Sequence, residues 1–474
     1  MFPLNVLHEN ILALLLFSCI VLFVYYLLPI SMRKYLLLVV SALFYVLCDA
    51  KMFFVLACTL LWTWFCARQI EKTAGKRWVV LGFLPVAFVL LFFKHNRFFV
   101  SSVDTFLATF GMGSTGGIIN IIMPLGISYY SFKAISYILD VYKGKITVKT
   151  SLADYALYLL YFAEVISGPI SRYNAFKTAL DDGMRYSHEH MERGFYCIVR
   201  GLFMKAVIAN RLSAYVATIF AAPEGYPGIA LWIAAFFYAV QLYCDFAGYS
   251  SIVVGITQLF GLFPVKNFIR PYFSVDIRDF WSRWHISLSS WLRDYIYIPL
   301  GGSKCSKFRR NCNVLIVFLA SGLWHGSGLN FVVWGLYHGL LNIITPKRRS
   351  PPEGIKKAGA IFLNFCLVTF GWIFFGTESL SVALRYISRM FTNLSFSFDA
   401  IQQAILPITG DNTCVAFFLL VVMFIVILAV RELHEERRKI DCYDVGSFVW
   451  QVFLLSMVLV FGSFGASGFI YANF

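Results

Sequence analysis

The stretch ILALLLFSCIVLFVYYLLPI, from Ile11 to Ile30, contains no charged residue. Its length matches the roughly 20 apolar residues that a helix needs to cross the hydrocarbon core of a bilayer. No Lys or Arg precedes it and no small-residue cleavage site follows it, so we expect a permanent anchor rather than a removed signal. This stretch therefore predicts a membrane-embedded chain.

Similar apolar segments recur along the whole sequence. They lie at 35–47, 53–66, 78–93, 118–142, 152–166, 194–222, 229–244, 249–263, 314–323, 331–344, 361–375, 415–430 and 448–464. Of the 474 residues, 59% are hydrophobic and 14% are charged, whereas about a quarter of a typical soluble protein is charged. We predict an all-α, polytopic integral membrane protein with roughly 11 to 13 membrane-embedded helices, some of them re-entrant or interfacial.

The formal net charge of +15 is concentrated in a few places. Three stretches, Arg68–Arg77, Lys266–Arg310 and Lys347–Lys357, hold 18 basic and five acidic residues and so carry +13 of it. By the positive-inside rule these stretches face the cytoplasm, which places the N-terminus outside. We expect no nucleic-acid partner, because no basic stripe is interleaved with aromatic residues that would stack on bases.

The 11 cysteines include no Cys-x-x-Cys pair, and most lie inside apolar segments. A thiol in such a setting packs as a small hydrophobic group. We expect neither disulfides nor a metal site.

Polar residues gather in the centre of the chain, inside segments that are otherwise apolar. In QLYCDFAGYSS, from Gln241 to Ser251, the carboxylate of Asp245 needs a partner or water at membrane depth. A structural role, linking neighbouring helices, is at least as plausible from the residues alone as a chemical one.

A helical spacing follows from Asp279. Seven residues fall on one apolar face: Trp281, Trp284, His285, Leu288, Trp291, Leu292 and Tyr295. The opposite face holds Arg283, Ser287, Ser290 and Asp294, so we predict an amphipathic helix at the cytoplasmic interface. By this pattern His285 faces inward, where a satisfied core histidine is the default interpretation.

The third polar block is LASGLWHGSGLNFVVWGLYHGLL, from Leu319 to Leu341. Small residues surround His325 and predict a helix break that another chain or a substrate can approach closely. Such a break is tolerated at membrane depth when it is buried in protein or lines a cavity. His325 is therefore a candidate functional group, whereas His338 is more simply explained by bonding within the bundle.

A buried histidine without a metal or a serine or cysteine nucleophile suits acyl transfer from a thioester to a hydroxyl. The thioester already stores the driving force, and the imidazole, whose pKa lies near neutral pH, removes the proton of the attacking oxygen. Positioning two substrates together supplies up to roughly 7–11 kcal/mol more in ideal cases.

At these residues the chain resembles the membrane-bound O-acyltransferase family, in particular its bacterial branch of alginate O-acetylation proteins and teichoic-acid D-alanyltransferases. The matching stretches are LLFFKHNRFF, PLGISYYSFKAISYILDVYKG, SGPISRY, QLYCDFAGYS, NFIRPYF, DFWSRWHISLSSWLRDYIYIPLGG, SGLWHG, GWIFFG and FIYANF. Many relatives have Asp where this chain has Ser251, which puts a polar contact near Asp245 in doubt.

The resemblance implies one domain over residues 1–474, with N-terminal helices at 1–117, a catalytic core at 118–345 and C-terminal helices at 346–474. It implies that His325 is the catalytic histidine and that His285 lines the same central tunnel, reached by a funnel from each membrane face. Six further residues are candidates for the tunnel lining: Asp245, Trp324, Asn330, Arg283, Arg293 and Tyr295.

We accordingly expect an O-acetyltransferase of the inner or plasma membrane that serves an exported or cell-wall polysaccharide. The donor is acetyl-CoA or another acyl thioester, with no bound cofactor. Expected partners are membrane lipids, an extracytoplasmic acyltransferase or small membrane protein, and an acyl carrier protein. D-alanyl transfer to teichoic acid stays open as an alternative. A solute transporter is disfavoured because no internal repeat is found.

Overall fold

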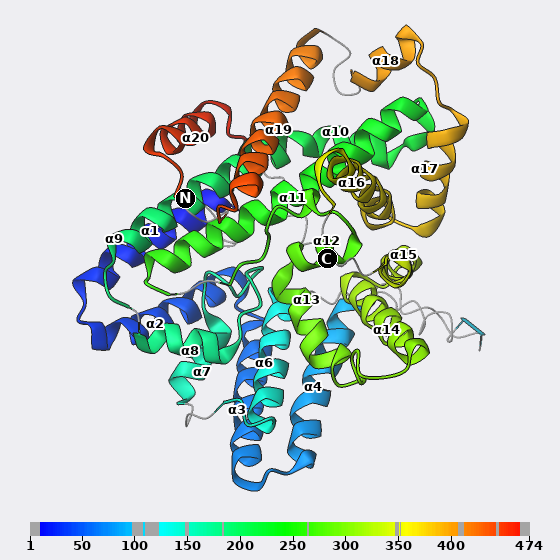
Figure 1. Ribbon diagram of the computed structural model, residues 1–474. Coiled ribbons are helices and arrows are strands. Elements are labelled where there is room, and N and C mark those ends of the chain that lie inside the picture. The colour runs from blue at the N-terminus through cyan, green and yellow to red at the C-terminus, as the bar shows by residue number, and fades with distance from the viewer. Residues whose placement is uncertain are drawn as a thin grey trace. The chain divides into compact units, whose positions relative to one another are not determined.

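The computed structural model describes residues 10–96, 108–109, 123–146, 151–182, 184–262, 265–346, 350, 352–405, 412–441 and 445–464. Within these residues the regular elements are helices and no strand is found, as the all-α prediction requires (Figure 1). Contacts divide the chain into two compact units, Met1–Met191 with Ile256–Val265, and Glu192–Gly255 with Lys266–Phe474.

Among the described residues, seven helical segments are long and apolar enough to cross a membrane. They are Ile30–Asp49, Phe53–Thr73, Lys76–Lys94, His188–Ala221, Gly228–Leu259, Gly354–Gly376 and Val415–Arg438. Ile11–Leu27, Leu329–Ile344 and Phe448–Phe461 are shorter apolar helices. The predicted multi-pass membrane character is thus confirmed in its coarse form, whereas the exact number of embedded helices stays a prediction.

The first unit consists of the N-terminal helices. They are α1 (Ile11–Leu27), α2 (Ile30–Asp49), α3 (Phe53–Thr73), α4 (Lys76–Lys94), α6 (Ile127–Tyr142), α7 (Leu152–Leu160) and α8 (Tyr173–Asp182). Helices α3, α4 and α6 pack on one another, and α6 is buried along nearly its whole length (Figure 1). Lys133 on α6 accordingly forms a buried ion pair with Glu164, at 2.5 Å.

The second unit begins within one uninterrupted helical segment, which is made of α9 (His188–Leu202), the π-helix η2 (Phe203–Ala209) and α10 (Asn210–Ala221). The further helices are η3 (Pro223–Gly225), α11 (Gly228–Leu259), η4 (Pro271–Phe273), α12 (Ile277–Arg283), α13 (Ile286–Leu292), the π-helix η5 (Arg293–Tyr297), α14 (Lys307–His325), α15 (Leu329–Ile344), α16 (Gly354–Gly376), α17 (Leu380–Thr392), α18 (Phe398–Ile405), α19 (Asn412–Arg438) and α20 (Phe448–Phe461). Helices α14 and α15 form a hairpin, and α15 packs on α16.

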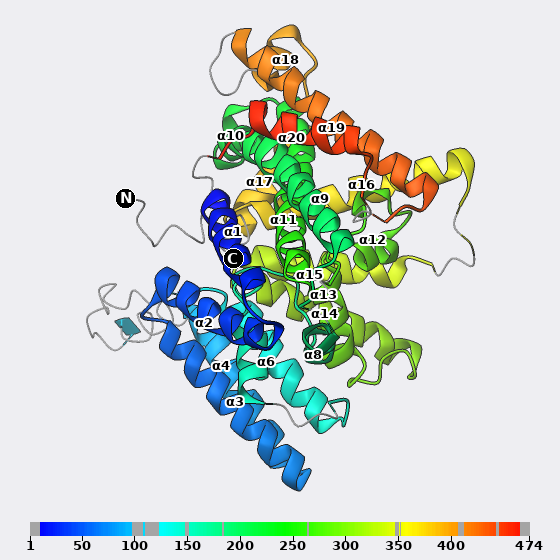
Figure 2. The same ribbon diagram turned by 90° about the vertical axis from the view of Figure 1, so that its left-hand side faces the viewer.

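Helices α9 and α11 lie side by side (Figures 1 and 2), and glycines of both helices lie at their contact. A Cβ atom on Gly255 would lie 2.5 Å from the carbonyl oxygen of Gly194, and one on Gly248 would lie 2.9 Å from that of Gly201. Real Cβ atoms do not come this close, so any larger residue at these positions forces the helices apart.

The structure corrects two predicted boundaries. The segments expected at 229–244 and 249–263 form the single helix α11, which passes through Asp245 without a break. The segment expected at 152–166 ends as a helix at Leu160, and turns follow. Residues 118–122 and the closing motif FIYANF lie outside the described part of the chain.

We predict that Gly255→Ala lowers the thermal unfolding temperature of the protein in detergent. Overpacking of this kind costs roughly 1–3 kcal/mol, because the added methyl group meets backbone rather than a flexible side chain. Gly359→Ala is the matched control, since nothing lies within 4 Å of its added Cβ and alanine favours the helix α16. Equal melting temperatures for the two variants would contradict the close packing of α9 and α11.

Candidate active site

His285 lies at a break between two short helices rather than within one amphipathic helix. Helix α12 ends at Arg283, Trp284 is extended, and His285 itself has a left-handed backbone with φ of 43°. This conformation is rare for a residue other than glycine and is strained. The predicted continuous helix from Asp279 is therefore wrong, and Ser287, expected on a polar outer face, is 2% exposed.

The segment that contains Asn267 produces this break. The backbone N–H of Ile286 donates to the carbonyl oxygen of Asn267 at 2.9 Å. The backbone N–H of Ile269 donates to the carbonyl oxygen of Arg283 at 3.0 Å. These bonds use backbone groups that a continuous helix would pair internally. A segment 18 residues earlier in the chain thus sets the backbone at His285.

His325 is the last residue of α14 and is 4% exposed. The next residue, Gly326, is fully extended, and a Cβ atom there would lie 2.4 Å from the ring of Phe331. The helix break predicted from the surrounding small residues is confirmed. It places the imidazole at the turn between α14 and α15.

Four aromatic side chains, Trp324, Trp334, Trp372 and Phe375, form what we call the aromatic cluster. The ring centroid of His325 lies 4.6 Å from that of Trp324, 5.3 Å from Trp334 and 4.9 Å from Phe375. All these contacts are edge-to-face, which is a favourable arrangement for aromatic rings. The cluster surrounds His325 with apolar surface and excludes bulk water from it.

Trp324 links the two histidines that the sequence singled out. Its ring centroid lies 6.3 Å from that of His285 and 4.6 Å from that of His325. The family resemblance placed both histidines in one tunnel, although 40 residues separate them in the sequence. The structure therefore brings His285 and His325 to the same indole.

His338 also belongs to this region. Its ring centroid lies 5.1 Å from Trp334 and 5.2 Å from Trp281, and the side chain is fully buried. Neither ring nitrogen has a hydrogen-bond partner among the described residues. Gly371 in the GWIFFG motif makes room for it, since a Cβ atom there would lie 2.6 Å from Nε2 of His338.

The six other candidate residues have different surroundings. Trp324 is part of the aromatic cluster, and Tyr295 packs on Trp291 with ring centroids 5.1 Å apart. Asp245 forms a buried ion pair with Lys205 of the π-helix η2, and Asn330 donates to the carbonyl oxygens of Phe374 and Thr377. Arg283 is paired with acidic side chains, and Arg293 is largely exposed. Their assignment to a tunnel stays a prediction.

An ionic cluster, which sequence reasoning missed, anchors the segments that carry the site. The carboxylate of Glu436 on α19 accepts from Nε of Arg270 at 3.0 Å and from Nη1 and Nη2 of Arg283 at 3.1 and 3.2 Å. Glu432 on the same helix accepts from Arg200 at 3.3 Å and from the hydroxyl of Tyr243 at 2.6 Å. The available signal was the helical spacing of these acidic residues after an apolar stretch.

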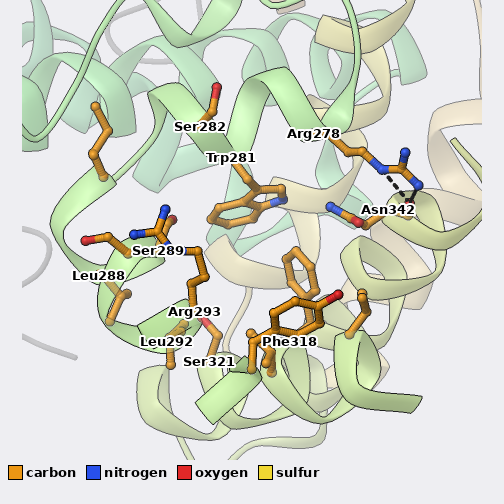
Figure 3. A pocket seen from close by; sticks show the side chains of 15 residues that line it. Arg278, Trp281, Ser282, Leu288, Ser289, Leu292, Arg293, Phe318, Ser321 and Asn342 are labelled. Atoms are coloured by element: carbon orange, nitrogen blue, oxygen red, sulfur yellow. Dashed lines mark hydrogen bonds between the residues drawn. The ribbon is translucent and has the colours of Figure 1, made fainter. Parts of the chain in front are cut away.

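A pocket of about 380 Å³ lies beside the site, between α12, α13, α14 and α15. Figure 3 shows the indole of Trp281 projecting into it, with Arg278 and Arg293 on different sides. The Arg278 guanidinium donates from Nε and Nη2 to the carbonyl oxygen of Asn342, while its buried Nη1 has no hydrogen-bond partner among the described residues. Ser321, one helical turn before His325, also lines the pocket.

The chemistry available here includes that of the neutral imidazole of His285. His285 lies outside the seven membrane-spanning segments, and its burial lowers its pKa to about 3, so the ring is uncharged at physiological pH. A neutral imidazole can accept a proton from a hydroxyl. Within the described residues, no group of three or more His, Cys, Asp or Glu side chains is arranged to hold a metal ion.

Comparison with known proteins gives consistent matches. The sequence model of the membrane-bound O-acyltransferase family matches residues 146–345. The chain is 33% identical to the probable alginate O-acetylase AlgI of Azotobacter vinelandii over 89% of this chain and 85% of that protein. It is 29% identical to the peptidoglycan O-acetyltransferase of Helicobacter pylori over 75% of this chain and 73% of that one. It is 31% identical to the teichoic acid D-alanyltransferase of Bacillus subtilis over 47% of this chain and 58% of that one.

We predict that Glu436→Ala destabilises the protein by about 1.5–3 kcal/mol, because it leaves Arg270 and Arg283 without an acceptor they share. Glu224→Ala is the control, since the side chains of the Arg385–Glu224 pair are 56% and 52% exposed and such pairs contribute less than about 1 kcal/mol. Thermal unfolding of both variants measures the difference. An equally small shift for Glu436→Ala would show that the ionic cluster does not hold the site together.

Proposed function

Because this chain belongs to the membrane-bound O-acyltransferase family, we propose that it moves acetyl groups from a thioester donor to hydroxyl groups of an exported or cell-wall polysaccharide. The observation that carries the proposal is His325, buried at a helix break inside the aromatic cluster and linked through Trp324 to His285. The chain is a multi-pass membrane protein and an O-acyltransferase. The acetyl group, the polymer and the role of each histidine are parts of the proposal.

In this mechanism His325 acts as the general base. Its imidazole takes the proton of the attacking hydroxyl, whose oxygen forms a bond to the thioester carbonyl carbon. The carbon–sulfur bond then breaks, and the proton passes from the imidazolium to the leaving thiolate. An ester and a free thiol result, so one histidine and two well-positioned substrates suffice. The apolar walls of the aromatic cluster protect the thioester from hydrolysis by excluding water.

The direction of transfer follows from charge. Under the positive-inside rule the basic region Lys266–Arg310 faces the cytoplasm, where acyl thioesters are made, and the N-terminus lies outside. A bundle of 11 to 13 membrane-embedded helices, with re-entrant segments around a tunnel, would let the acceptor reach His325 from the opposite membrane face. An inner-membrane location, an extracytoplasmic acyltransferase as recipient and an acyl carrier protein as donor are further expectations of this scheme.

The pocket beside the site is our candidate for docking the donor. Acetyl-CoA is anionic at its phosphates and has a long, flexible pantetheine arm, and the pocket offers arginines at Arg278 and Arg293 with apolar walls between them. Nη1 of Arg278 has no hydrogen-bond partner among the described residues, and a phosphate oxygen would supply one. Ser321 places the pocket one helical turn from His325, along the same helix.

Acetyl is favoured over D-alanyl as the transferred group. The probable alginate O-acetylase of Azotobacter vinelandii aligns over 89% of this chain, against 47% for the teichoic acid D-alanyltransferase of Bacillus subtilis. Mass analysis of the ester groups released from the surface polymer separates the two. D-alanine among those esters, in place of acetate, would overturn the choice.

His325→Ala should abolish polymer acetylation in the native host, with a loss of roughly 100-fold or more for removal of a general base. Acetyl content of the surface polymer, together with the amount of protein in the membrane, is the measurement. His434→Ala is the matched control, because His434 is an exposed histidine on α19. Normal acetylation by His325→Ala at normal protein levels would refute the proposed function.

Arg278→Gln should raise the KM for acetyl-CoA roughly tenfold, the effect of losing one hydrogen bond to a charged group, with little change in kcat. Acetyl transfer by purified protein in lipid vesicles measures both constants. Arg309→Gln removes an equal charge from an exposed position on α14 and should leave KM unchanged. Equal KM values for the two variants would exclude the pocket as the donor site.

A further inference from the structure

Four buried polar side chains form a junction beside the site: Ser250 on α11, Asn267, His285 and Ser287. Their exposed fractions are 0%, 0%, 1% and 2%. Asn267 is at the centre, because its Oδ1 lies 3.0 Å from Nδ1 of His285 and 2.9 Å from the hydroxyl oxygen of Ser287. Its Nδ2 donates to the hydroxyl of Ser250 at 3.2 Å.

The orientation of the Asn267 amide follows from a backbone group. The N–H of Ser287 lies 3.3 Å from the same side-chain atom and can only donate, so that atom has to be the carbonyl oxygen. Rotating the amide by 180° would turn an NH₂ group toward this N–H, which would place two donors against each other. The acceptor therefore faces His285.

The protonation of the His285 ring follows in turn. A carbonyl oxygen accepts but cannot donate, so the Nδ1 atom that faces it has to carry the hydrogen. In a neutral imidazole the other nitrogen is then the acceptor. Asn267 thus selects the tautomer with hydrogen on Nδ1 and the lone pair on Nε2.

The ring is also held in place. The centroid of His285 lies 4.7 Å from the edge-to-face ring of Phe246 and 6.3 Å from the rings of Phe268 and Trp324. The backbone carbonyl of Asn267 holds the following residue, Ile286, at 2.9 Å. Asn267 therefore controls the position of His285 through its main chain and the tautomer through its side chain.

We propose that Asn267 is a positioning residue for acyl transfer: it locks His285 with hydrogen on Nδ1, so that Nε2 accepts a hydrogen bond from the acceptor hydroxyl and orients that hydroxyl toward His325. This inference rests on the proposed function for its catalytic consequence. The tautomer itself is a property of the resting protein and can be measured without any reaction.

The direct test is the nitrogen NMR spectrum of the protein in lipid, with its eight histidines labelled with ¹⁵N. Comparison with His285→Gln assigns the signals of His285. We expect a protonated Nδ1 and an unprotonated Nε2 in the wild type. A proton on Nε2 in the wild type would overturn the proposal by itself, whether or not any variant folds.

Two substitutions that keep the branched shape of the side chain then separate loss of the acceptor from loss of the side chain. Asn267→Asp keeps an oxygen acceptor, and Ser250 can rotate its hydroxyl to donate to it, so this variant should retain the tautomer and most activity. Asn267→Leu removes the acceptor and should lose the Nδ1–H signal, with kcat reduced roughly 10- to 100-fold, the usual effect of losing such a supporting partner. The KM for acetyl-CoA should change little.

Ser250→Ala is the matched control, since it breaks the other hydrogen bond of the amide but leaves Oδ1 in place. It should keep both the tautomer and the activity. An Asn267→Leu protein that retains the Nδ1–H signal, or that transfers acetyl normally without it, would refute the positioning role. Acetylation by His325→Ala tests the proposed function, whereas the NMR signals of His285 test this inference. The failure of one is therefore distinguishable from the failure of the other.

Discussion

Lys205 and Asp245 form an ion pair between two apolar helices of the second unit, and this pair illustrates the constraint on which the rest of the structure depends. A charge that is buried away from water is tolerated when it finds an opposite charge and enough hydrogen bonds inside the protein. The same condition is met by Lys133 with Glu164 in the first unit and by Arg200 with Glu432 in the second. Polar groups therefore tie particular helices together, while the apolar surface alone would allow many arrangements.

The surroundings of His325 differ from those of the buried ion pairs. Around His325 the walls are aromatic rings rather than charges, and the imidazole is surrounded by Trp324, Trp334 and Phe375. A low-dielectric setting of this kind strengthens each hydrogen bond made to a bound substrate. The charged groups, including Glu436 and its arginine partners, pair with one another on the elements that carry the histidines. Electrostatic anchoring and the proposed proton transfer thus involve separate residues.

The sequence predicted those features that depend on local pattern. The apolar segments and the break after His325 follow from composition and from the small residues around it, and both are present. The break at His285 could not be predicted, since the spacing from Asp279 fits a helix and the bonds that interrupt it come from Asn267. The continuity of α11 was missed for the same reason, because Lys205, the partner that makes Asp245 tolerable, lies 40 residues away on another helix. Glu436 likewise acts on arginines more than 150 residues distant.

The left-handed backbone of His285 bears on which residues evolution can place at this position. At φ of 43° a glycine would fit without strain, but it would remove the imidazole that packs on Phe246 and is hydrogen-bonded to Asn267. The backbone strain alone would favour replacing this histidine. A strained backbone at a buried histidine is the trade-off between stability and activity that the proposed role of His285 implies.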